Sequence, residues 1–314
     1  MSRICVTGGA GFIGSNLCEG LLNDDSNDHT VVCFDDLSNS SMDNIRHLFL
    51  YKKRFKFIQG DVRDNDALEK ALDGCDSIVH LAAQIHVDKS SYAVRDTMTR
   101  NVDGTMNVLE YVRRKDIPMV FASSSEIYGT AQYPIMDESH QTNPQSVYAA
   151  SKLAGDRLCH AYHDTYDIPV TVLRQFNTYG PRQSDTSYGG AISIFTKRVL
   201  EGKSPLIFGS GQASRDYTYV DDVVEAYMKI LGSAFYGKFI NYGTGQDIKI
   251  IDLANKIINL CEVDVEPVHV APRPNEVMRL CCDNRSAKIL FNTSPKYDID
   301  EGLSKYIKWY RGMG

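Results

Sequence analysis

Tyr148 and Lys152 stand four positions apart, in a stretch whose apolar spacing predicts a helix over Tyr148–Tyr166. Residues four apart on a helix project from the same face, so the phenol and the ammonium would be neighbours. A phenol is a poor base because its ordinary pKa is about 10, and adjacent positive charge would lower that pKa. The pair alone is common, but in the right context it predicts a group that takes a proton from a substrate hydroxyl.

The N-terminal segment supplies such a context. Gly8, Gly11 and Gly14 follow a short apolar run and open a helical pattern, with the spacing of a dinucleotide-binding turn. One glycine permits the tight turn, a second the close approach of a diphosphate, and a third close helix packing. The diphosphate then lies over the positive end of the helix. Phe12 and Ile13, inside the same turn, are expected to contact the cofactor.

The ends of the next three strands are expected to hold the rest of the dinucleotide. Asp35 lies about 20 residues after the turn, where a carboxylate accepts hydrogen bonds from the adenosine ribose. It would repel a 2′-phosphate, and no Arg follows immediately, so NAD is favoured over NADP. Asp61 and Val62 are expected near the adenine, although an Asp there can instead cap the helix near Ala67. Leu81-Ala82-Ala83 would let the backbone approach the dinucleotide.

An α/β fold must position these groups. The first half alternates short β-branched runs with longer amphipathic stretches, which predicts a Rossmann-type doubly wound parallel sheet. The expected strands are Ile4–Thr7, Val31–Asp35, Phe55–Gly60, Ser77–His80, Met119–Ser123 and Val170–Arg174. The expected helices are Ile13–Leu22, Ala67–Leu72, Thr97–Arg113 and Tyr148–Tyr166, with Tyr219–Leu231 packed back on the main sheet.

Beyond Asn177 the alternation weakens, and Gly, Pro and Ser interrupt the chain. We therefore expect an NAD-binding Rossmann domain over residues 1–176, rejoined by about 212–243. A smaller, discontinuous α/β C-terminal lobe, from 177–211 and 244–314, is expected to bind the substrate. Its pocket is expected to be built by residues 183–194 and 205–208.

Composition excludes several classes of protein. The chain has 314 residues, 43% of them hydrophobic, and a net charge of −6 with scattered Lys and Arg, which argues against nucleic acid or membrane as a partner. No apolar run approaches the ~18 residues of a membrane span, and the start of the sequence has no signal-peptide pattern. Eight cysteines without a C-x-x-C pair predict buried, reduced thiols in a cytoplasmic protein. No clustered Cys and His ligands predict a metal site.

Taken in order, these and further segments resemble the extended short-chain dehydrogenase/reductase family, and within it the NAD-dependent nucleotide-sugar epimerases and dehydratases. Several segments are loose individually, but their order is highly specific. The segments are Thr7–Ser15, Asp35 with Asn39-Ser40, His80–Ala83, Asn101–Thr105, Ser123–Gly129, Tyr148–Lys152, Gln175–Asn177, Gly180–Arg182, Arg215–Tyr217 and Pro272–Pro274.

The resemblance implies that NAD stays bound while an NDP-sugar is transiently oxidised at C4, in a homodimer formed by the helices Thr97–Arg113 and Tyr148–Tyr166. By the same likeness Tyr148 is the C4 base, Lys152 holds the nicotinamide ribose and Ser124 hydrogen-bonds the C4 oxygen. Cofactor contacts are also implied for Asn39 and Ser40. Substrate contacts are implied for Gln84, Ser125, Asn177, Arg215, Arg273 and Glu276.

Glu126, two residues past Ser124, bears on the reaction. Once C4 is a ketone the C5 proton is acidic, and a carboxylate at this position would remove it as the C6 hydroxyl leaves. Nucleotide-sugar 4,6-dehydratases carry a Glu here, and His86–Ser90 is similar to a segment of dTDP-glucose 4,6-dehydratases. We therefore expect an NDP-sugar 4,6-dehydratase.

Other outcomes stay open from the sequence. Ser125 stands where many dehydratases have an Asp, and UDP-glucuronate decarboxylases share the Ser-Glu pair. The segment Arg215–Asp222 and the region around Arg273 are similar to 4-epimerases. A 4-epimerase, a decarboxylase and a non-catalytic NAD-sensing protein are thus the alternatives.

Overall fold

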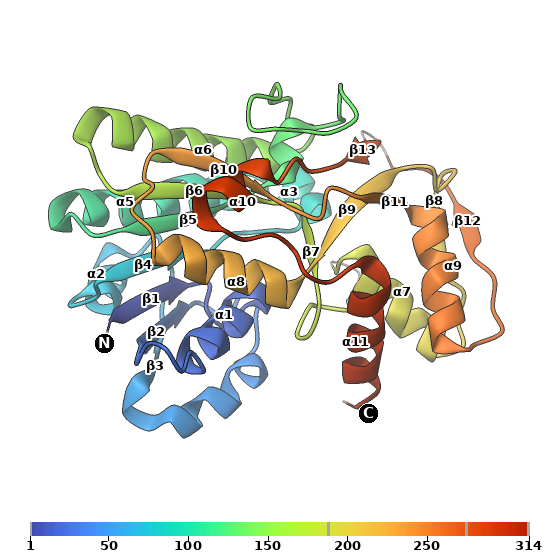
Figure 1. Cartoon of the computed structure of the whole chain (residues 1–314), viewed down its shortest axis with the longest axis horizontal. Helices are drawn as coiled ribbons and strands as arrows, with labels where there is room; N and C mark the ends of the chain where they lie inside the picture. Colours follow the sequence, from blue (N-terminus) through green and yellow to red (C-terminus); the bar gives the residue numbers. More distant parts are fainter. Residues whose placement is uncertain (1, 187–188, 274–275, 313–314) are drawn as a thin grey trace.

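A computed structural model describes residues 2–186, 189–273 and 276–312. Its centre is a sheet of seven strands, all parallel, in the order β10-β6-β5-β4-β1-β2-β3 (Figure 1). The strands are β1 (Arg3–Thr7), β2 (Thr30–Asp35), β3 (Phe55–Gln59), β4 (Ser77–His80), β5 (Met119–Ser124), β6 (Val170–Gln175) and β10 (Lys238–Tyr242). This is a Rossmann-type sheet extended by one strand, which confirms the expected fold class.

The six expected strands are all present, each within a residue of its expected bounds at either end. The inner strands β2, β4 and β5 are buried along almost their whole length. Strands covered on both faces need continuous apolar runs, and such runs are what the sequence offers. The seventh strand, β10, was not predicted from the sequence. It pairs with β6, with Lys238 opposite Thr171 at one end and Tyr242 opposite Gln175 at the other.

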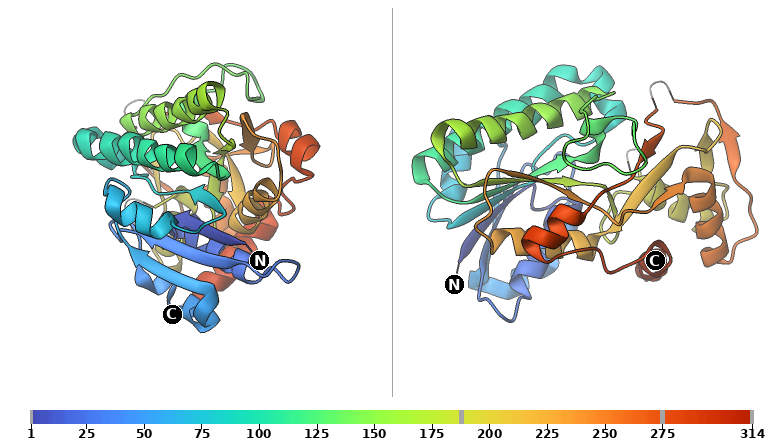
Figure 2. Two further views of the ribbon diagram at one scale, coloured as in Figure 1. Left: turned by 90° about the vertical axis from the view of Figure 1, so that its left-hand side faces the viewer. Right: turned by 45° about the horizontal axis from the view of Figure 1, so that its top comes forward.

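Helices cover both faces of the sheet. One face is covered by α1 (Phe12–Leu22), α8 (Val220–Leu231) and α10 (Arg285–Phe291), which share one apolar core with the strands. The other is covered by α2 (Asn65–Leu72), α5 (Gly104–Lys115) and α6 (Val147–Tyr166). α5 and α6 run side by side in both figures (Figure 2). The placement of α8 on the main sheet confirms the expectation for Tyr219–Leu231.

The expected helix Thr97–Arg113 is a longer helical run with a break. It consists of α4 (Val94–Met98), a π turn η3 (Thr99–Asp103) and α5. The π turn turns Asn101 inward, where its side chain donates to Gln84 O and Ser151 Oγ and accepts from Gln84 N. The bond to Ser151 ties the run to α6, and the two with Gln84 tie it to the segment that follows β4. The short helices α3 (Val87–Tyr92), η1 (Met42–Asn44), η2 (Arg46–Arg54) and η4 (Ser125–Tyr128) complete this half of the chain.

A smaller lobe lies at the end of the sheet where the strands finish, toward the right in Figure 1. Its main sheet is built on β9 (Ser214–Tyr219), which pairs with β7 (Asn177–Tyr179), β11 (Asp247–Lys249) and β13 (Arg279–Leu280). β8 (Leu206–Phe208) and β12 (Val268–Val270) form a separate pair. α7 (Ala191–Leu200), α9 (Ile250–Cys261) and α11 (Ile299–Arg311) enclose a third apolar core.

The division into two domains remains our proposal, with two adjustments. β9 falls in the stretch assigned to the Rossmann domain, yet its partners are lobe strands. α10 falls in the stretch assigned to the lobe, yet Ala287 and Phe291 belong to the core of the main sheet. The lobe and the main domain therefore exchange more segments than the sequence pattern indicated.

Two compositional expectations can be compared with the structure. All eight cysteines are free and buried, as predicted. In the ranges that the structure describes, no helix is both long and apolar enough to cross a membrane.

Candidate active site

A cleft of about 510 Å³ opens along the carboxyl ends of β1, β2, β3 and β4 and continues to β5 and α6. Every residue expected to contact the cofactor lines it, from the first glycine of the turn to the Tyr/Lys pair. They are Gly8, Gly11, Phe12, Ile13, Gly14, Asp35, Asn39, Ser40, Asp61, Val62, Leu81, Ala82, Ala83, Tyr148 and Lys152. Ligands of open α/β sheets bind at this edge, so the cleft has the position of a dinucleotide site.

The glycine turn fits a diphosphate. Gly8 has a φ of +70°, and a Cβ there would lie 2.8 Å from Ala82 N. A Cβ on Gly14 would lie 2.1 Å from Gly8 O, so only glycine lets α1 pack this closely on the turn. Gly11 caps α1 without any side-chain hydrogen bond. The first amide groups of the helix therefore remain available to an anion.

Asp35 is buried at the end of β2 and accepts hydrogen bonds from Ala10 N (3.0 Å), Leu37 N (2.8 Å) and Ser40 Oγ (2.7 Å). Burial raises its pKa, and the hydrogen bonds oppose that shift. These bonds fix the carboxylate in the cleft wall, where it can accept from a ribose hydroxyl. Ser40 thus also acts as a support for Asp35.

Asp61 lies in the cleft and is paired with Arg63, whose Nε is 3.0 Å from Asp61 Oδ1. Hydrogen bonding with Arg63 holds the pKa of Asp61 below its usual value, against the opposing effect of burial. α2 is capped instead by Asp64, which accepts from Asp66 N and Ala67 N. The helix-cap alternative for Asp61 is therefore wrong.

Lys152 is buried on α6 with its Nζ 4.5 Å from the centre of the Phe121 ring. Burial lowers its pKa to about 8, while Cys159 and Asp156 act in the opposite direction. Behind it, His80 is held between Thr7 Oγ1 (2.7 Å) and Thr105 Oγ1 (3.0 Å), and burial lowers its pKa to about 3. A neutral His80 adds no second positive charge beside Lys152.

Tyr148 sits in the first turn of α6, where Ser146 caps the helix and Tyr148 N donates to Ser90 Oγ. Burial raises the pKa of its phenol to about 12; a hydrogen bond with Ser124 lowers it, and the charge of Glu126 raises it. The lowering expected from the Lys152 ammonium together with the positive nicotinamide ring concerns the NAD-bound enzyme, and it stays a prediction.

Ser124, Glu126 and Tyr148 meet where the main sheet joins the lobe. Glu126 lies one residue into η4, directly after β5, and its amide donates to Ser124 Oγ (3.2 Å). Burial raises the pKa of the Glu126 carboxyl, and the charge of Arg215 opposes the rise. Arg215 also interacts with Tyr217, two residues along β9. Asn177 lies opposite Tyr217 in the register of β7 and β9, and its Oδ1 is buried without a partner.

The other expected substrate residues are more scattered. Gln84 is fully buried, with its amide bonded to His86 and Thr97 Oγ1. These bonds hold the segment that leads to α3. They engage both amide atoms of Gln84, which does not favour the expected contact with the substrate. Ser125 is buried at the start of η4.

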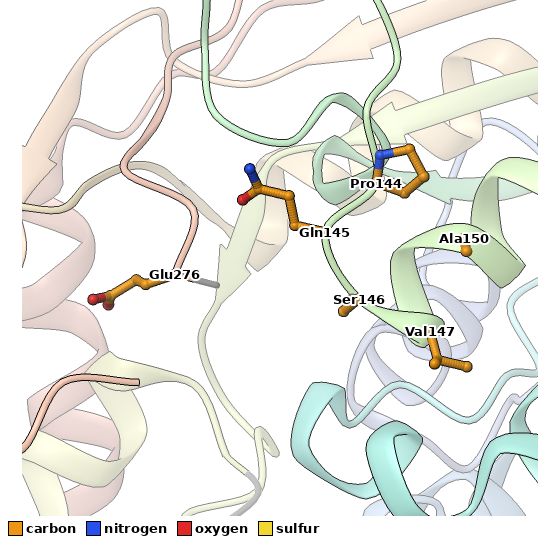
Figure 3. A pocket seen from close by; sticks show the side chains of 6 residues that line it. All are labelled: Pro144, Gln145, Ser146, Val147, Ala150 and Glu276. Carbon is orange, nitrogen blue, oxygen red and sulfur yellow. The ribbon is translucent and has the colours of Figure 1, made fainter. Parts of the chain in front are cut away.

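Arg273 and Glu276 lie on the lobe side of the opening. The Arg273 guanidinium is 4.1 Å from the centre of the Phe208 ring and 3.8 Å from the Asp88 carboxylate. Pro274, between them, lies outside the described residues, as do residues 187 and 188 of the expected substrate pocket. Glu276 lines a second hollow, of about 490 Å³, opposite Gln145 and the start of α6 (Figure 3). Gln145 Oε1 is buried without a partner in that wall.

A fully buried ion pair supports the catalytic segments from behind. Arg174 of β6 contacts Asp156 of α6 through Nε (2.8 Å) and Nη2 (2.9 Å), and neither side chain is exposed. Asp156 also accepts from Ser123 Oγ (2.9 Å), and Arg174 donates to the hydroxyl of Tyr128 (2.8 Å). Asp156 follows Lys152 by one helical turn. The pair thus joins β5, β6, η4 and α6 at one point.

Sequence reasoning missed several residues of the cleft. Arg100, Gln175, Trp309 and Tyr310 line it and were given no role. Arg100 comes from the π turn, far in sequence from its neighbours, and no local motif marks it. Arg182 was noted only as part of a loose segment; it donates to Glu19 Oε2 (2.7 Å) and so ties that segment to α1.

The fold and the cleft define a nucleotide-binding enzyme of the Rossmann class. Residues 4–243 match the NAD dependent epimerase/dehydratase family, and the chain belongs to that family. A putative UDP-glucose 4-epimerase of Methanocaldococcus jannaschii is 35% identical, and a dTDP-glucose 4,6-dehydratase of Streptomyces niveus is 32% identical. The alignments cover 98% of this chain and 98% and 93% of those proteins.

Solved structures agree with this assignment. A UDP-glucuronic acid 4-epimerase from Bacillus cereus, in complex with UDP-glucuronic acid and NAD, superposes with a TM-score of 0.92 at 31% identity, over 99% of this chain and all of that one. The chain is thus an NAD-dependent enzyme that modifies nucleotide sugars, as the resemblance implied. Its relatives include both epimerases and dehydratases.

Proposed function

We propose that the chain is an NDP-sugar 4,6-dehydratase. The observation that carries the proposal is the position of Glu126, a carboxylate beside Tyr148 and Ser124 whose pKa is raised by burial. A carboxyl of raised pKa is a better base than an ordinary one and can return the proton that it takes. The C4 oxidation that the family's reactions share needs Tyr148 and Lys152, but it does not need a carboxyl at the position of Glu126.

The chain's own groups account for each proton transfer. Tyr148 takes the proton of the C4 hydroxyl while Ser124 holds the C4 oxygen, and Lys152 holds the nicotinamide ribose. NAD, when bound, would supply the acceptor for the C4 hydride and the donor for C6. Glu126 removes the C5 proton, and the C6 hydroxyl leaves as water.

The leaving hydroxyl also needs a proton. Ser125 occupies the position where many dehydratases carry an Asp, so no second carboxyl is available from that position. We propose that Glu126 passes the proton it takes from C5 to the C6 hydroxyl. C5 then regains a proton from Tyr148, which took it from the C4 hydroxyl and passes it on through Glu126. The balance is the loss of one water from the sugar, with the hydride moved from C4 to C6 and a proton moved from the C4 oxygen to C5.

We propose that the diphosphate and nucleoside lie toward the lobe. Arg215 and Arg273 suit a diphosphate because the planar guanidinium offers a fork of donors. The partnerless amide oxygen of Asn177 would accept a hydrogen bond there, and Glu276 would accept from the nucleoside ribose. The alternative activities use the same contacts, so Glu126 is what favours a dehydratase over a 4-epimerase, and the product must distinguish a dehydratase from a decarboxylase, which shares the Ser-Glu pair.

The test is the mass of the product. Purified protein, incubated with a panel of UDP-, GDP- and dTDP-hexoses, is expected to yield a 4-keto-6-deoxy sugar nucleotide that has lost one water. A product of unchanged mass would establish epimerisation, and loss of carbon dioxide would establish decarboxylation; either result contradicts the proposal.

Two variants test the residue roles. Glu126→Gln is expected to abolish loss of water yet still form NADH, seen by its near-ultraviolet absorbance, because C4 oxidation does not need Glu126. Tyr148→Phe is the matched control and is expected to abolish both signals. Normal dehydration by Glu126→Gln would show that this residue moves no proton.

A further inference from the structure

A cluster of five charged side chains surrounds the adenosine end of the cofactor cleft. Asp36 follows Asp35 at the end of β2, Asp61 follows β3, and Asp96 and Arg100 lie on α4 and η3. Arg63 completes the cluster by pairing with Asp61 and Asp96. Their side chains are between 19% and 35% exposed, so the charges are partly shielded from water.

Arg100 is the member of this cluster that bears on whether the cleft selects NAD or NADP. Its Nη1 pairs with the Asp36 carboxylate and donates to Ser38 Oγ (3.1 Å), and its Nε donates to Asp96 Oδ1 (2.9 Å). Asp61 Oδ2 is 3.8 Å from the same Nη1. Arg100, Asp36 and Ser38 all line the cleft, next to Asp35.

The presence of this guanidinium changes the basis of cofactor preference. From the sequence, NAD is favoured because the Asp35 carboxylate would repel a 2′-phosphate and no Arg follows it immediately. In the structure an Arg does reach that neighbourhood, from a position 64 residues beyond Asp36. Dinucleotide folds commonly use a nearby Arg to accept the 2′-phosphate of NADP. Asp35 alone is then an incomplete account of why NAD is selected.

We propose that Asp36 is a specificity-determining residue for the cofactor, acting by holding the Arg100 guanidinium away from the 2′ position of the adenosine ribose. Asp96 accepts from Nε and Asp36 pairs with Nη1, so two of the three guanidinium nitrogens that could bind a phosphate are already engaged. A 2′-phosphate would have to displace Asp36 and would then meet two carboxylates, Asp35 and Asp36. The same Arg becomes a phosphate ligand once Asp36 is neutral.

The test compares the nucleotide bound to the purified full chain with and without this restraint. Wild type, Asp36→Asn, Arg100→Met and the double variant are each incubated with equal excess NAD and NADP, and the bound nucleotides are released and quantified by mass spectrometry. Asp36→Asn is expected to raise the bound NADP/NAD ratio about tenfold or more, the effect of one charge-assisted hydrogen bond. The double variant is expected to return to the wild-type ratio.

The readout does not depend on the sugar reaction, so it holds whether the enzyme is a dehydratase or an epimerase. An unchanged ratio in Asp36→Asn, with a normal melting temperature, would overturn the proposal. An equal rise in the double variant would also overturn it, because the gain would then not pass through Arg100. Loss of NAD from the single variant Arg100→Met would overturn the proposal as well, because Arg100 would then hold NAD directly. Should Asp36→Asn melt early, Asp36→Ser is measured in its place against the same two outcomes.

Discussion

Replacing Asp156 by Asn would leave the Arg174 guanidinium buried without a counter-charge. Both side chains are fully buried, and two hydrogen bonds of 2.8 and 2.9 Å join them. Breaking such a pair from one side costs about 3–5 kcal/mol. Folded proteins are stable by about 5–15 kcal/mol, so a large part of the total would be lost. For a chain of this size the melting temperature is expected to fall by roughly 5–8 °C.

The assay is thermal unfolding of the NAD-loaded protein, with a matched ion pair at the surface as control. Glu69 and Arg114 form such a pair, with both side chains 52% exposed. Glu69→Gln is expected to shift the melting temperature by no more than about 1–2 °C, because exposed pairs contribute about 0–1 kcal/mol. The double change Asp156→Leu with Arg174→Met removes both charges and is expected to cost less than Asp156→Asn alone.

A second readout follows from the charge of Asp156, which raises the pKa of Lys152. Asp156→Asn is expected to lower that pKa further, so activity at alkaline pH should decline at a lower pH than in wild type. If Asp156→Asn melts within about 2 °C of wild type, the argument that Arg174 needs Asp156 as its buried counter-charge is wrong.

Two further predictions concern the cleft. Gly14→Ala places a Cβ 2.1 Å from Gly8 O, and such overpacking costs about 1–3 kcal/mol. We therefore expect the purified Gly14→Ala variant to carry much less NAD than wild type. The control is Gly232→Ala, whose Cβ would lie 3.7 Å from its nearest neighbour and which should retain NAD. Lys152 has a pKa near 8, so it loses its charge, and the enzyme its activity, as the pH rises through 8. Lys152→Arg stays charged, so its residual kcat should not fall there; the same alkaline decline in both proteins would exclude Lys152 as its source.

The residues that could be predicted are those fixed by local spacing. Gly8, Gly11 and Gly14 share one turn, and Tyr148 and Lys152 share one helix face, so their positions follow from the geometry of a single element. Five of the predicted strands, β1, β2, β4, β5 and β6, were predictable because burial on both faces demands continuous apolar runs; β3, at the edge of the sheet, is only partly buried.

Features that depend on distant segments could not be predicted. Arg100 contacts Asp36 only because the π turn η3 lies next to the end of β2 in the folded chain. No sequence pattern in either segment indicates that the two are neighbours. β10 is five residues long and follows a helix of the main sheet, so nothing local distinguished it from a loop. Burial raises the pKa of the Tyr148 phenol, and no spacing in the sequence reveals that effect.

The late position of β10 in the chain has a consequence for synthesis. β1–β6 are complete by Gln175, but the strand that covers the outer edge of β6 begins only at Lys238. At ~5–20 residues per second, the ribosome needs roughly 3–12 s to make the intervening segment. During that time the backbone of β6 is an open edge next to apolar side chains, the kind of surface on which nascent chains aggregate. The edge of β6 is therefore exposed in the growing polypeptide until the seventh strand pairs with it.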